Sequence, residues 1–353
     1  MCESHDSLFG LVGSAVGMEV GRWCRGPRLN HALRSLRGSE PNRAPKRLVI
    51  DVGALDGLDA ISFARFARLP VWTFEAGPTK IEPIRERVRA AGFADNVTLF
   101  AAALGNRTGE AWFEMTLAPH PVGRRFMRGQ LGSATDKLVT KPTASATPKR
   151  HVSVVSVPMQ RLDDLVVDHE TRVPFLKVDA QGFDFEVLRG AERLLRGGFV
   201  DRFLFEFMPS GMPDTGEAAR GLNFLQELGH YACTPCNGGN APIKMSRPTC
   251  AASYVQDYAT ASSHRRAAGG DWYDDIACVH RRLLTPQAAG GVHTSSGRPA
   301  QTHGTKVKPK LHSPANLAGE RSAQPVAVPA SPRPPRAAHQ RPAAARAPRL
   351  PAG

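Results

Sequence analysis

Four acidic side chains each stand at the end of a short apolar run that has the length of a buried β-strand. They are Asp51, Glu75, Asp179 and Glu206. In an open parallel sheet, ligands bind in the crevice outside the carboxyl ends of the strands. Acids placed there can accept hydrogen bonds from hydroxyl groups, attract a cationic ligand or take up a proton. The four acids therefore predict one binding site along one rim of a sheet.

The first of these acids opens a glycine turn that ends at Gly57. Gly53 and Gly57 lie four residues apart, so the turn lacks the G-x-G-x-x-G spacing that seats a pyrophosphate on a helix N-terminus. Glu75 is placed as a second-strand acid that accepts hydrogen bonds from both ribose hydroxyls. A ligand with a nucleoside but no phosphate fits this pattern. S-adenosyl-L-methionine (SAM) is such a ligand, and its positive sulfonium suits an acidic rim.

Strands and helices alternate along the middle of the chain, which is typical of parallel βαβ units. The predicted strands cover residues 47–51, 71–75, 96–100, 111–115, 152–157, 174–179, 203–206, 230–236 and 275–280. The predicted helices begin near residues 58, 78, 161 and 183 and cover 217–228. The fold class is therefore predicted to be α/β, with a mostly parallel, Rossmann-like sheet.

A long irregular segment, residues 117–150, interrupts this alternation. It holds seven basic residues and a single acid, Asp136. Loops of that length within a compact domain are usually functional or disordered. We expect this segment to form a partial lid over the site.

Composition divides the chain into three parts. Residues 1–46 show no sustained periodicity, and we expect a loosely ordered segment with one short helix near residues 29–36. Residues 47–281 form the expected folded domain. The segment 285–353 holds 12 of the 29 prolines and ten basic residues against one acid, which is +9 of the net charge of +14. Such a segment buries too little apolar surface to fold. We expect a disordered tail that binds polyanions nonspecifically, and no specific nucleic-acid partner.

The cysteines and the apolar runs indicate the compartment. No run approaches the roughly 18 to 20 apolar residues of a membrane span, so neither a span nor a signal peptide is predicted. Six cysteines are too few for a disulfide scaffold, which favours a reducing, cytoplasmic setting. Cys233, Cys236, Cys250 and Cys278 leave a zinc site open as an alternative to ordinary thiols. No metal is predicted in the site at the sheet rim.

Several stretches resemble a known family, the FkbM-type SAM-dependent methyltransferases. They are VIDVGALDGLDAISFA from residue 49, WTFEAGP from 72, NVTLFAAALGNRTGEAWF from 96, GSAT from 132, MQRLDDL from 159 and FLKVDAQGFDFEVLRGA from 175. The resemblance covers about residues 47–281, and the last stretch is its most specific part. It implies a class I methyltransferase sheet that ends in an antiparallel hairpin, and methyl transfer usually to a hydroxyl oxygen.

The resemblance also implies roles for single residues. Those expected to bind the cofactor are Asp51, Gly53, Ala54, Gly57, Glu75, Ala102 and Ala103. Those expected at the transfer centre are Asp179, Glu206, Gln181 and Ser133. The chain departs from the family at Leu55, where Asn is frequent, and at Ala76, where Pro is frequent.

The expected reaction is O-methylation of a hydroxyl on a small molecule, sugar or lipid-like acceptor. Asp179 is the first candidate for the base that takes the hydroxyl proton, and Glu206 is the second. Asp179 could instead orient the acceptor through a hydrogen bond. Two other functions stay open: a catalytically silent binding module whose basic tail recruits an acidic partner, and an NAD-dependent oxidoreductase.

Overall fold

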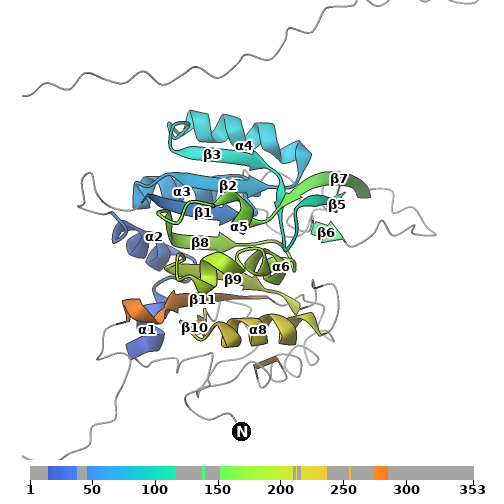
Figure 1. Ribbon diagram of the computed structural model, residues 1–353. Coiled ribbons are helices and arrows are strands. Elements are labelled where there is room, and N and C mark those ends of the chain that lie inside the picture. Colours follow the sequence, from blue (N-terminus) through green and yellow to red (C-terminus); the bar gives the residue numbers. More distant parts are fainter. Residues whose placement is uncertain are drawn as a thin grey trace, which may run out of the picture. The chain divides into compact units, whose positions relative to one another are not determined.

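The computed structural model describes residues 15–37, 46–116, 137–139, 152–209, 212, 216–236, 254–255 and 273–284. Its main element is a seven-stranded sheet with the strand order β10-β11-β9-β8-β1-β2-β3 (Figure 1). In chain order the strands are β1 (Arg47–Val52), β2 (Val71–Glu75), β3 (Val97–Ala101), β8 (Arg172–Val178), β9 (Arg202–Phe207), β10 (Tyr231–Pro235) and β11 (Asp274–His280). Only β11 runs antiparallel, to both β9 and β10. The predicted α/β class with a C-terminal antiparallel hairpin is confirmed.

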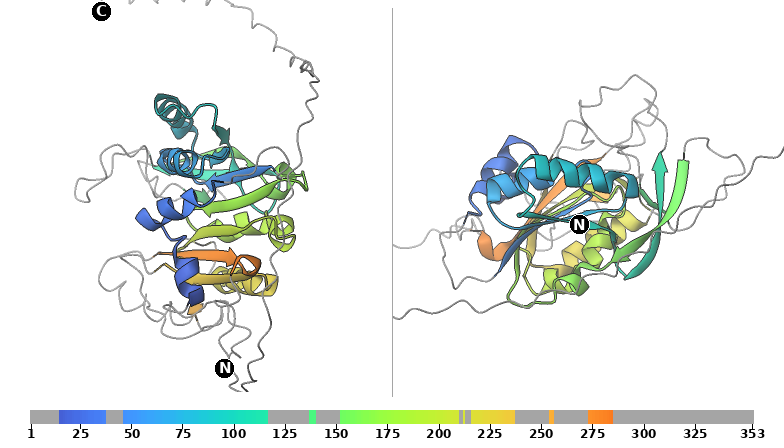
Figure 2. Two further views of the ribbon diagram at one scale, coloured as in Figure 1. Left: turned by 90° about the vertical axis from the view of Figure 1, so that its left-hand side faces the viewer. Right: turned by 90° about the horizontal axis from the view of Figure 1, so that it is seen from above.

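Helices cover both faces of this sheet (Figure 2). One face carries α1 (Ala15–Gly21), α2 (Pro27–Arg34), α3 (Leu58–Ala67) and α4 (Pro78–Ala90). The other carries α5 (Leu162–Leu165), α6 (Asp184–Arg189), α7 (Glu192–Arg196) and α8 (Glu217–Leu228). Successive strand residues point to opposite faces, so Val49 packs with the first group and Ile50 with the second. Because both faces are buried, the strands read as continuous apolar runs.

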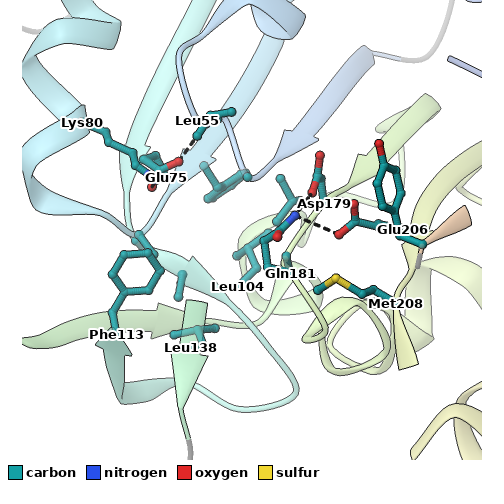
Figure 3. Close-up of a pocket in the computed structure, with 18 of the residues that line it drawn as sticks. Leu55, Glu75, Lys80, Leu104, Phe113, Leu138, Asp179, Gln181, Glu206 and Met208 are labelled. Carbon is teal, nitrogen blue, oxygen red and sulfur yellow. Dashed lines mark hydrogen bonds and ion pairs between the residues drawn. The ribbon is translucent and has the colours of Figure 1, made fainter. Parts of the chain in front are cut away.

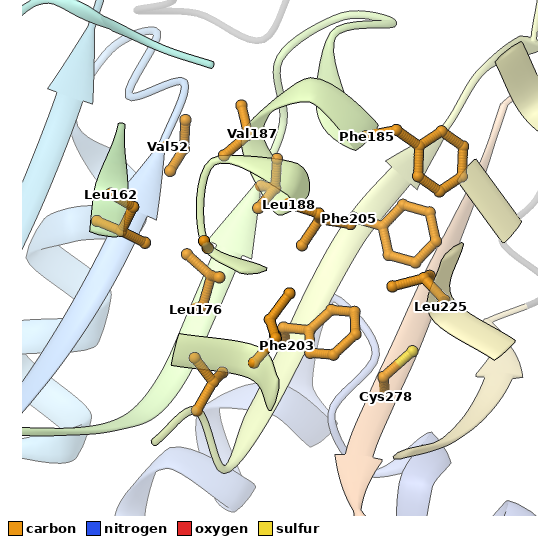
Figure 4. Packing of buried hydrophobic residues seen from close by; sticks show 14 of the residues in the cluster. Val52, Leu162, Leu176, Phe185, Val187, Leu188, Phe203, Phe205, Leu225 and Cys278 are labelled. Carbon is orange, nitrogen blue, oxygen red and sulfur yellow. The ribbon is translucent and has the colours of Figure 1, made fainter. Parts of the chain in front are cut away.

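Aromatic side chains fill the layer beneath α6 and α8. Phe185 of α6 lies 5.4 Å from Phe205 of β9 between ring centroids. Phe203 of β9 and Leu225 of α8 belong to the same buried cluster (Figure 4). Burial of each such ring contributes about 1.5–3 kcal/mol. This layer fixes α6, and with it the turn that joins β8 to α6.

A second, smaller sheet has the order β4-β7-β5-β6. Its strands are β4 (Ala103–Leu104), β5 (Gly109–Thr116), β6 (Lys137–Val139) and β7 (Val152–Gln160). It has a buried cluster of its own, which includes Phe113, Leu138 and Met159. Of the segment expected to form a lid, the structure describes β6; the rest, Ser133 included, lies outside the described residues.

The N-terminal segment differs from expectation. Instead of a loosely ordered stretch with one helix, residues 15–37 form α1 and α2 joined by a turn. Val20, Trp23 and Leu33 are buried in the same cluster as the first face of the main sheet. The short apolar repeat was too brief to reveal this, because helices of seven or eight residues derive their stability from packing rather than from their own sequence.

Among the described residues, four cysteines form two disulfides. Cys24 is bonded to Cys236, and Cys233 is bonded to Cys278 across the β10–β11 pair. Three cysteines of the zinc alternative are thus held in disulfides, and the fourth, Cys250, lies outside the described residues. The zinc interpretation is therefore wrong for these residues. Disulfides are rare in reducing compartments, so both bonds also weigh against the predicted cytoplasmic setting.

The chain divides into two compact units, residues 1–293 and 294–353. The second unit lies outside the described residues, and so does the whole of the tail predicted to be disordered, residues 285–353. Among the helices that the structure describes, none has the length and apolar character that crossing a membrane requires.

Gly190 provides a test of the packing between α6 and the small sheet. A Cβ at this position would lie 2.0 Å from the carbonyl oxygen of Gly105. Gly190→Ala should therefore lower the free energy of unfolding by about 1–3 kcal/mol, the usual cost of overpacking. Urea denaturation measures this. Gly21→Ala is the matched control, because nothing lies within 4 Å of its Cβ. Unchanged stability of Gly190→Ala would contradict the close approach of this helix end to Gly105.

Candidate active site

A cavity of about 310 Å³ lies over the carboxyl ends of β1, β2, β8 and β9 (Figure 3). Its lining includes polar residues and an apolar wall. The polar residues are Arg25, Glu75, Lys80, Asp179, Gln181, Glu206 and Tyr273. The apolar wall includes Phe74, Leu104, Phe113, Leu138 and Met208. Glu75, Phe113 and Leu138 lie on one side of the cavity in Figure 3, whereas Gln181, Glu206 and Met208 gather on the other.

Glu75, at the end of β2, is held by the backbone. Its Oε2 accepts a hydrogen bond from the amide of Leu55 at 2.9 Å, and its Oε1 accepts one from the amide of Gly77 at 2.7 Å. Lys80 places its ammonium 3.8 Å from Oε1. Each carboxylate oxygen has a second lone pair. The carboxylate is therefore fixed in direction and can still accept hydrogen bonds from a ligand.

The glycine turn after β1 brings the backbone close to the end of β8. Gly53 has a φ of 80°, and a Cβ there would lie 1.9 Å from the carbonyl oxygen of Asp179. Leu55 has a φ of 52°, a left-handed conformation that costs a residue with a Cβ about 1–2 kcal/mol. Asn, frequent in the family at this position, tolerates that conformation better. The strained Leu55 presents its amide to Glu75, so the turn and the carboxylate are fixed together.

Lys177, buried on β8, joins the carboxylates behind the cavity. Its ammonium lies 3.2 Å from Asp51, 3.2 Å from Asp59 and 3.6 Å from Asp179. Burial alone would lower the pKa of Lys177, but the three carboxylates outweigh burial and raise it. Burial raises the pKa of Asp51 to about 6 against the opposing effect of Lys177. Asp51 also accepts a hydrogen bond from the hydroxyl of Thr73.

Asp179 stays ionised at the rim of the cavity. Burial works to raise the pKa of Asp179, but the charges of Lys177 and Arg25 outweigh burial and hold it well below its usual range. Arg25 donates to Oδ2 at 2.6 Å, and the Gln181 amide donates to Oδ1 at 2.9 Å. Both oxygens are thus held by donors, and the carboxylate keeps a fixed orientation.

Gln181 links the two candidate catalytic acids. Its amide nitrogen donates to Asp179 and, at 2.8 Å, to Oε2 of Glu206. The residue has a φ of 53° and is followed by Gly182 with a φ of 95°. A left-handed residue other than glycine is uncommon, and such strain clusters at functional sites. Here the strained backbone aims the amide at both acids.

Glu206 has the opposite charge state to Asp179. Burial, followed by the charge of Asp179 and then that of Asp184, raises the pKa of Glu206 to about 9. Asp184 accepts backbone hydrogen bonds from Ala180 and Gly182 and so holds the β8–α6 turn. Burial and the charge of Asp179 raise its pKa to about 7. At neutral pH this end of the cavity therefore holds an ionised Asp179 beside a protonated Glu206.

The structure brings together most of the residues predicted for the site. Those that line the cavity are Gly53, Glu75, Ala102, Ala103, Asp179, Gln181 and Glu206. Asp51, Ala54 and Gly57 are not among the lining residues that the structure describes. Asp51 lies beneath Lys177, and Gly57 caps the start of α3.

Comparison with known proteins identifies the domain that carries this site. Residues 51–216 match the family model of the methyltransferase FkbM domain. This part of the chain is an FkbM methyltransferase domain. SAM is the cofactor of the family, which confirms the cofactor predicted from the sequence. No curated protein matches the sequence.

Solved structures resemble the methyltransferase domain only distantly. The cofactor-bound protein Rv0187 from MTB is 14% identical, with a TM-score of 0.34 and coverage of 76% of this chain and 94% of its own. The O-methyltransferase TomG from Streptomyces achromogenes, involved in tomaymycin synthesis and solved with SAM, is 13% identical, with a TM-score of 0.34 and coverage of 71% and 77%. A human methyltransferase 10 domain containing protein is 8% identical, with a TM-score of 0.32 and coverage of 71% and 80%. Values this low support no statement about the substrate.

The residues present fit SAM. The cavity volume lies at the lower end of the roughly 300–1,000 Å³ typical of ligand sites. A fixed carboxylate at Glu75 suits a pair of ribose hydroxyls. Small residues, Ala102 and Ala103, and an apolar wall leave room for a flat base. The set of donors and acceptors in the methyltransferase domain therefore matches the chemistry of this cofactor.

Sequence reasoning missed several lining residues. Arg25 and Tyr273 lie outside the residues of the family match and carried no motif. Phe113 and Leu138 enter through the small sheet, whose pairing was not predicted. Lys80 could have been found, because it follows Glu75 by five residues at the start of a predicted helix.

The raised pKa of Glu206 predicts how stability depends on pH. The folded protein keeps this proton up to about pH 9, whereas a free Glu loses it near 4.5. Between these values the folded state binds one proton more than the unfolded chain, so stability falls as the pH rises. Glu206→Gln removes this proton difference. Its Tm relative to the unmodified protein should rise between about pH 5 and pH 8 by at least about 2–4 °C, equivalent to roughly 1 kcal/mol.

Calorimetry at both pH values measures this difference. Glu227→Gln, on the exposed side of α8, is the matched control and should show no such trend. A constant difference between Glu206→Gln and the unmodified protein would mean that Glu206 is ionised in the folded state.

Proposed function

We propose that this protein transfers the methyl group of SAM to a hydroxyl oxygen of a small-molecule, sugar or lipid-like acceptor. The observation that carries the proposal is the pairing of an ionised Asp179 with a protonated Glu206 through Gln181, at the end of the cavity opposite Glu75. One end is built to hold a nucleoside, and the other is built to hold a hydroxyl group. We take residues 47–281 as the catalytic domain.

In this proposal the Glu75 end holds the cofactor. Glu75 accepts hydrogen bonds from the ribose hydroxyls, and its direction is already set by Leu55 and Gly77. Ala102 and Ala103 lie beside the base. Gly53 brings the backbone of the first turn to the methionine part, which Asp51, Ala54 and Gly57 support from behind. When bound, SAM supplies an electrophilic methyl group.

Asp179 orients the acceptor. Its ionised carboxylate accepts a hydrogen bond from the acceptor hydroxyl and so directs an oxygen lone pair toward the methyl group. Transfer of the methyl group to the hydroxyl oxygen would break its bond to sulfur and release S-adenosylhomocysteine. The hydroxyl proton would become strongly acidic in this step, so even a carboxylate with a lowered pKa could take it. Holding the reacting atoms in line can account for about 7–11 kcal/mol of the barrier.

Glu206 contributes a neutral carboxyl group. Because it holds its proton at neutral pH, it adds no second negative charge beside Asp179 and can donate a hydrogen bond to the acceptor. Ser133 stays a predicted contact of the transfer centre, and the tail stays a predicted binder of polyanions; both lie outside the described residues.

The cofactor assignment is tested by isothermal titration with SAM and, separately, with NAD. We expect SAM to bind and NAD not to bind. Glu75→Gln should weaken SAM binding by roughly 10- to 100-fold, since it removes a charged acceptor worth about 1.5–3 kcal/mol. Glu86→Gln, on the exposed side of α4, is the matched control. Binding of NAD without binding of SAM would favour the oxidoreductase. Unchanged SAM affinity in Glu75→Gln would show that Glu75 does not bind the ribose hydroxyls.

Turnover separates the two acids. Release of S-adenosylhomocysteine is measured with a panel of hydroxylated acceptors. Asp179→Asn should lower kcat by about 100-fold or more, the usual contribution of a base. Glu206→Gln should stay within about tenfold of the unmodified protein, because an amide resembles the protonated acid.

The reverse pattern would make Glu206 the base. If SAM binds but no hydroxylated acceptor is methylated, the silent binding module becomes the better description of the protein.

A further inference from the structure

Arg25 reaches the active site from outside the methyltransferase domain match. It lies in the turn between α1 and α2, 26 residues before the match begins, and it lines the cavity. Its Nη2 donates to Oδ2 of Asp179 at 2.6 Å, and its Nε lies 2.9 Å from Oδ2 of Asp275. One guanidinium thus bridges the end of β8 and the start of β11.

The turn that carries Arg25 is anchored immediately before it. Trp23 is buried in the cluster on the first face of the main sheet. Its ring lies 5.5 Å from that of Phe175 on β8, and the guanidinium of Arg202 lies 4.5 Å from its centroid. Such contacts order a side chain within a packed core. The backbone two residues from Arg25 is therefore fixed against the strand that ends at Asp179.

A disulfide anchors the residue next to Arg25. Cys24 is bonded to Cys236, which directly follows β10. The amide of Cys236 donates to the carbonyl oxygen of Asp275 at 2.7 Å. The disulfide and the ion pair of Arg25 therefore join the N-terminal turn to the same place, the start of β11. The closed covalent loop is long, with a sequence separation of 212 residues.

We propose that Arg25 is a positioning residue for Asp179 and that the Cys24–Cys236 disulfide holds it over the cavity. The consequence for methyl transfer rests on the role given to Asp179 in the proposed function. The pairing itself does not depend on that role. The catalytic domain would then include the N-terminal turn, because this turn supplies Arg25 to the active site.

Arg25 acts on Asp179 within a crowded group of charges. The groups that face Asp179 are Lys177, Arg25, Gln181, Asp184, Glu206, Tyr273 and Asp275. Arg25 forms ion pairs with two acids, Asp179 and Asp275, whereas Lys177 forms ion pairs with three, Asp51, Asp59 and Asp179. Removing Arg25 should leave Asp179 less strongly ionised and less firmly held.

The geometry suits an arginine. Two separate nitrogens of one planar group each reach a carboxylate on a different strand, and a lysine ammonium lacks this fixed fork. The Arg25 side chain is 38% exposed, so replacing it should not prevent folding. Arg25→Gln removes the charge, and Arg25→Lys keeps it.

The titration of Asp179 tests the pairing without cofactor or acceptor. The full chain is labelled with ¹³C at the aspartate carboxyl carbons, and the Asp179 signal is identified by its loss in Asp179→Asn. In Arg25→Gln the titration midpoint of Asp179 should rise by about one to three pH units, the usual effect of losing an adjacent cation. Arg25→Lys should restore part of that shift. An unchanged midpoint in Arg25→Gln would overturn the pairing.

The two disulfides described above provide matched variants that test the tether. The double variant Cys24→Ser, Cys236→Ser should shift the Asp179 midpoint in the same direction as Arg25→Gln. The double variant Cys233→Ser, Cys278→Ser breaks a disulfide between the paired strands β10 and β11 and should leave the midpoint unchanged. Equal shifts in both double variants would show that the Cys24–Cys236 bond has no specific role in placing Arg25.

Titration of the unmodified protein with SAM is carried out in parallel. Failure to bind SAM would contradict the proposed function. The titration midpoints of Asp179 would still show whether Arg25 pairs with Asp179. Conversely, SAM binding together with an unchanged Asp179 midpoint in Arg25→Gln would support the proposed function and contradict the role of Arg25 as a positioning residue.

Discussion

The buried ammonium of Lys177 is the interaction on which the site depends. It sits opposite Asp51 in the register of β1 and β8, and it contacts acids from β1, α3 and the end of β8. A buried charge without partners is very costly, and so is a cluster of acids without a cation. Lys177 and the three acids therefore each offset the cost of burying the other's charge. Together they fix the register of the two central strands, the start of α3 and the position of Asp179.

The strands of the main sheet could be predicted from the sequence. The strands and helix starts expected from apolar runs agree with the structure within a few residues, as for Val71–Glu75 and Glu217–Leu228. Both faces of the sheet are buried, so each strand is a continuous apolar run with a clear end. The acids at those ends could be placed at one rim because parallel strands share an edge.

The remaining parts of the site depend on contacts between distant segments. Asp51 was expected beside the cofactor, but it is fully buried, pairs with its register partner Lys177 and does not line the cavity. Arg25 lies in a turn whose packing depends on Trp23 and on a disulfide, neither of which has a local signal. The charge states of Asp179 and Glu206 are set by burial and by charged neighbours that lie far apart in the sequence, from Arg25 to Asp275. Sequence can name these acids, but only the folded arrangement makes one ionised and the other neutral.

The small sheet has a consequence for how the protein responds to a ligand. Phe113 and Leu138 wall the cavity from a sheet that has its own buried cluster, separate from the two clusters of the main sheet. A molecule in the cavity would touch both sheets and add contacts between them. Anything that binds only the folded state stabilises it by an amount that grows with concentration. A bound ligand would thus hold the two sheets together, and the stability of the domain would rise with the concentration of that ligand.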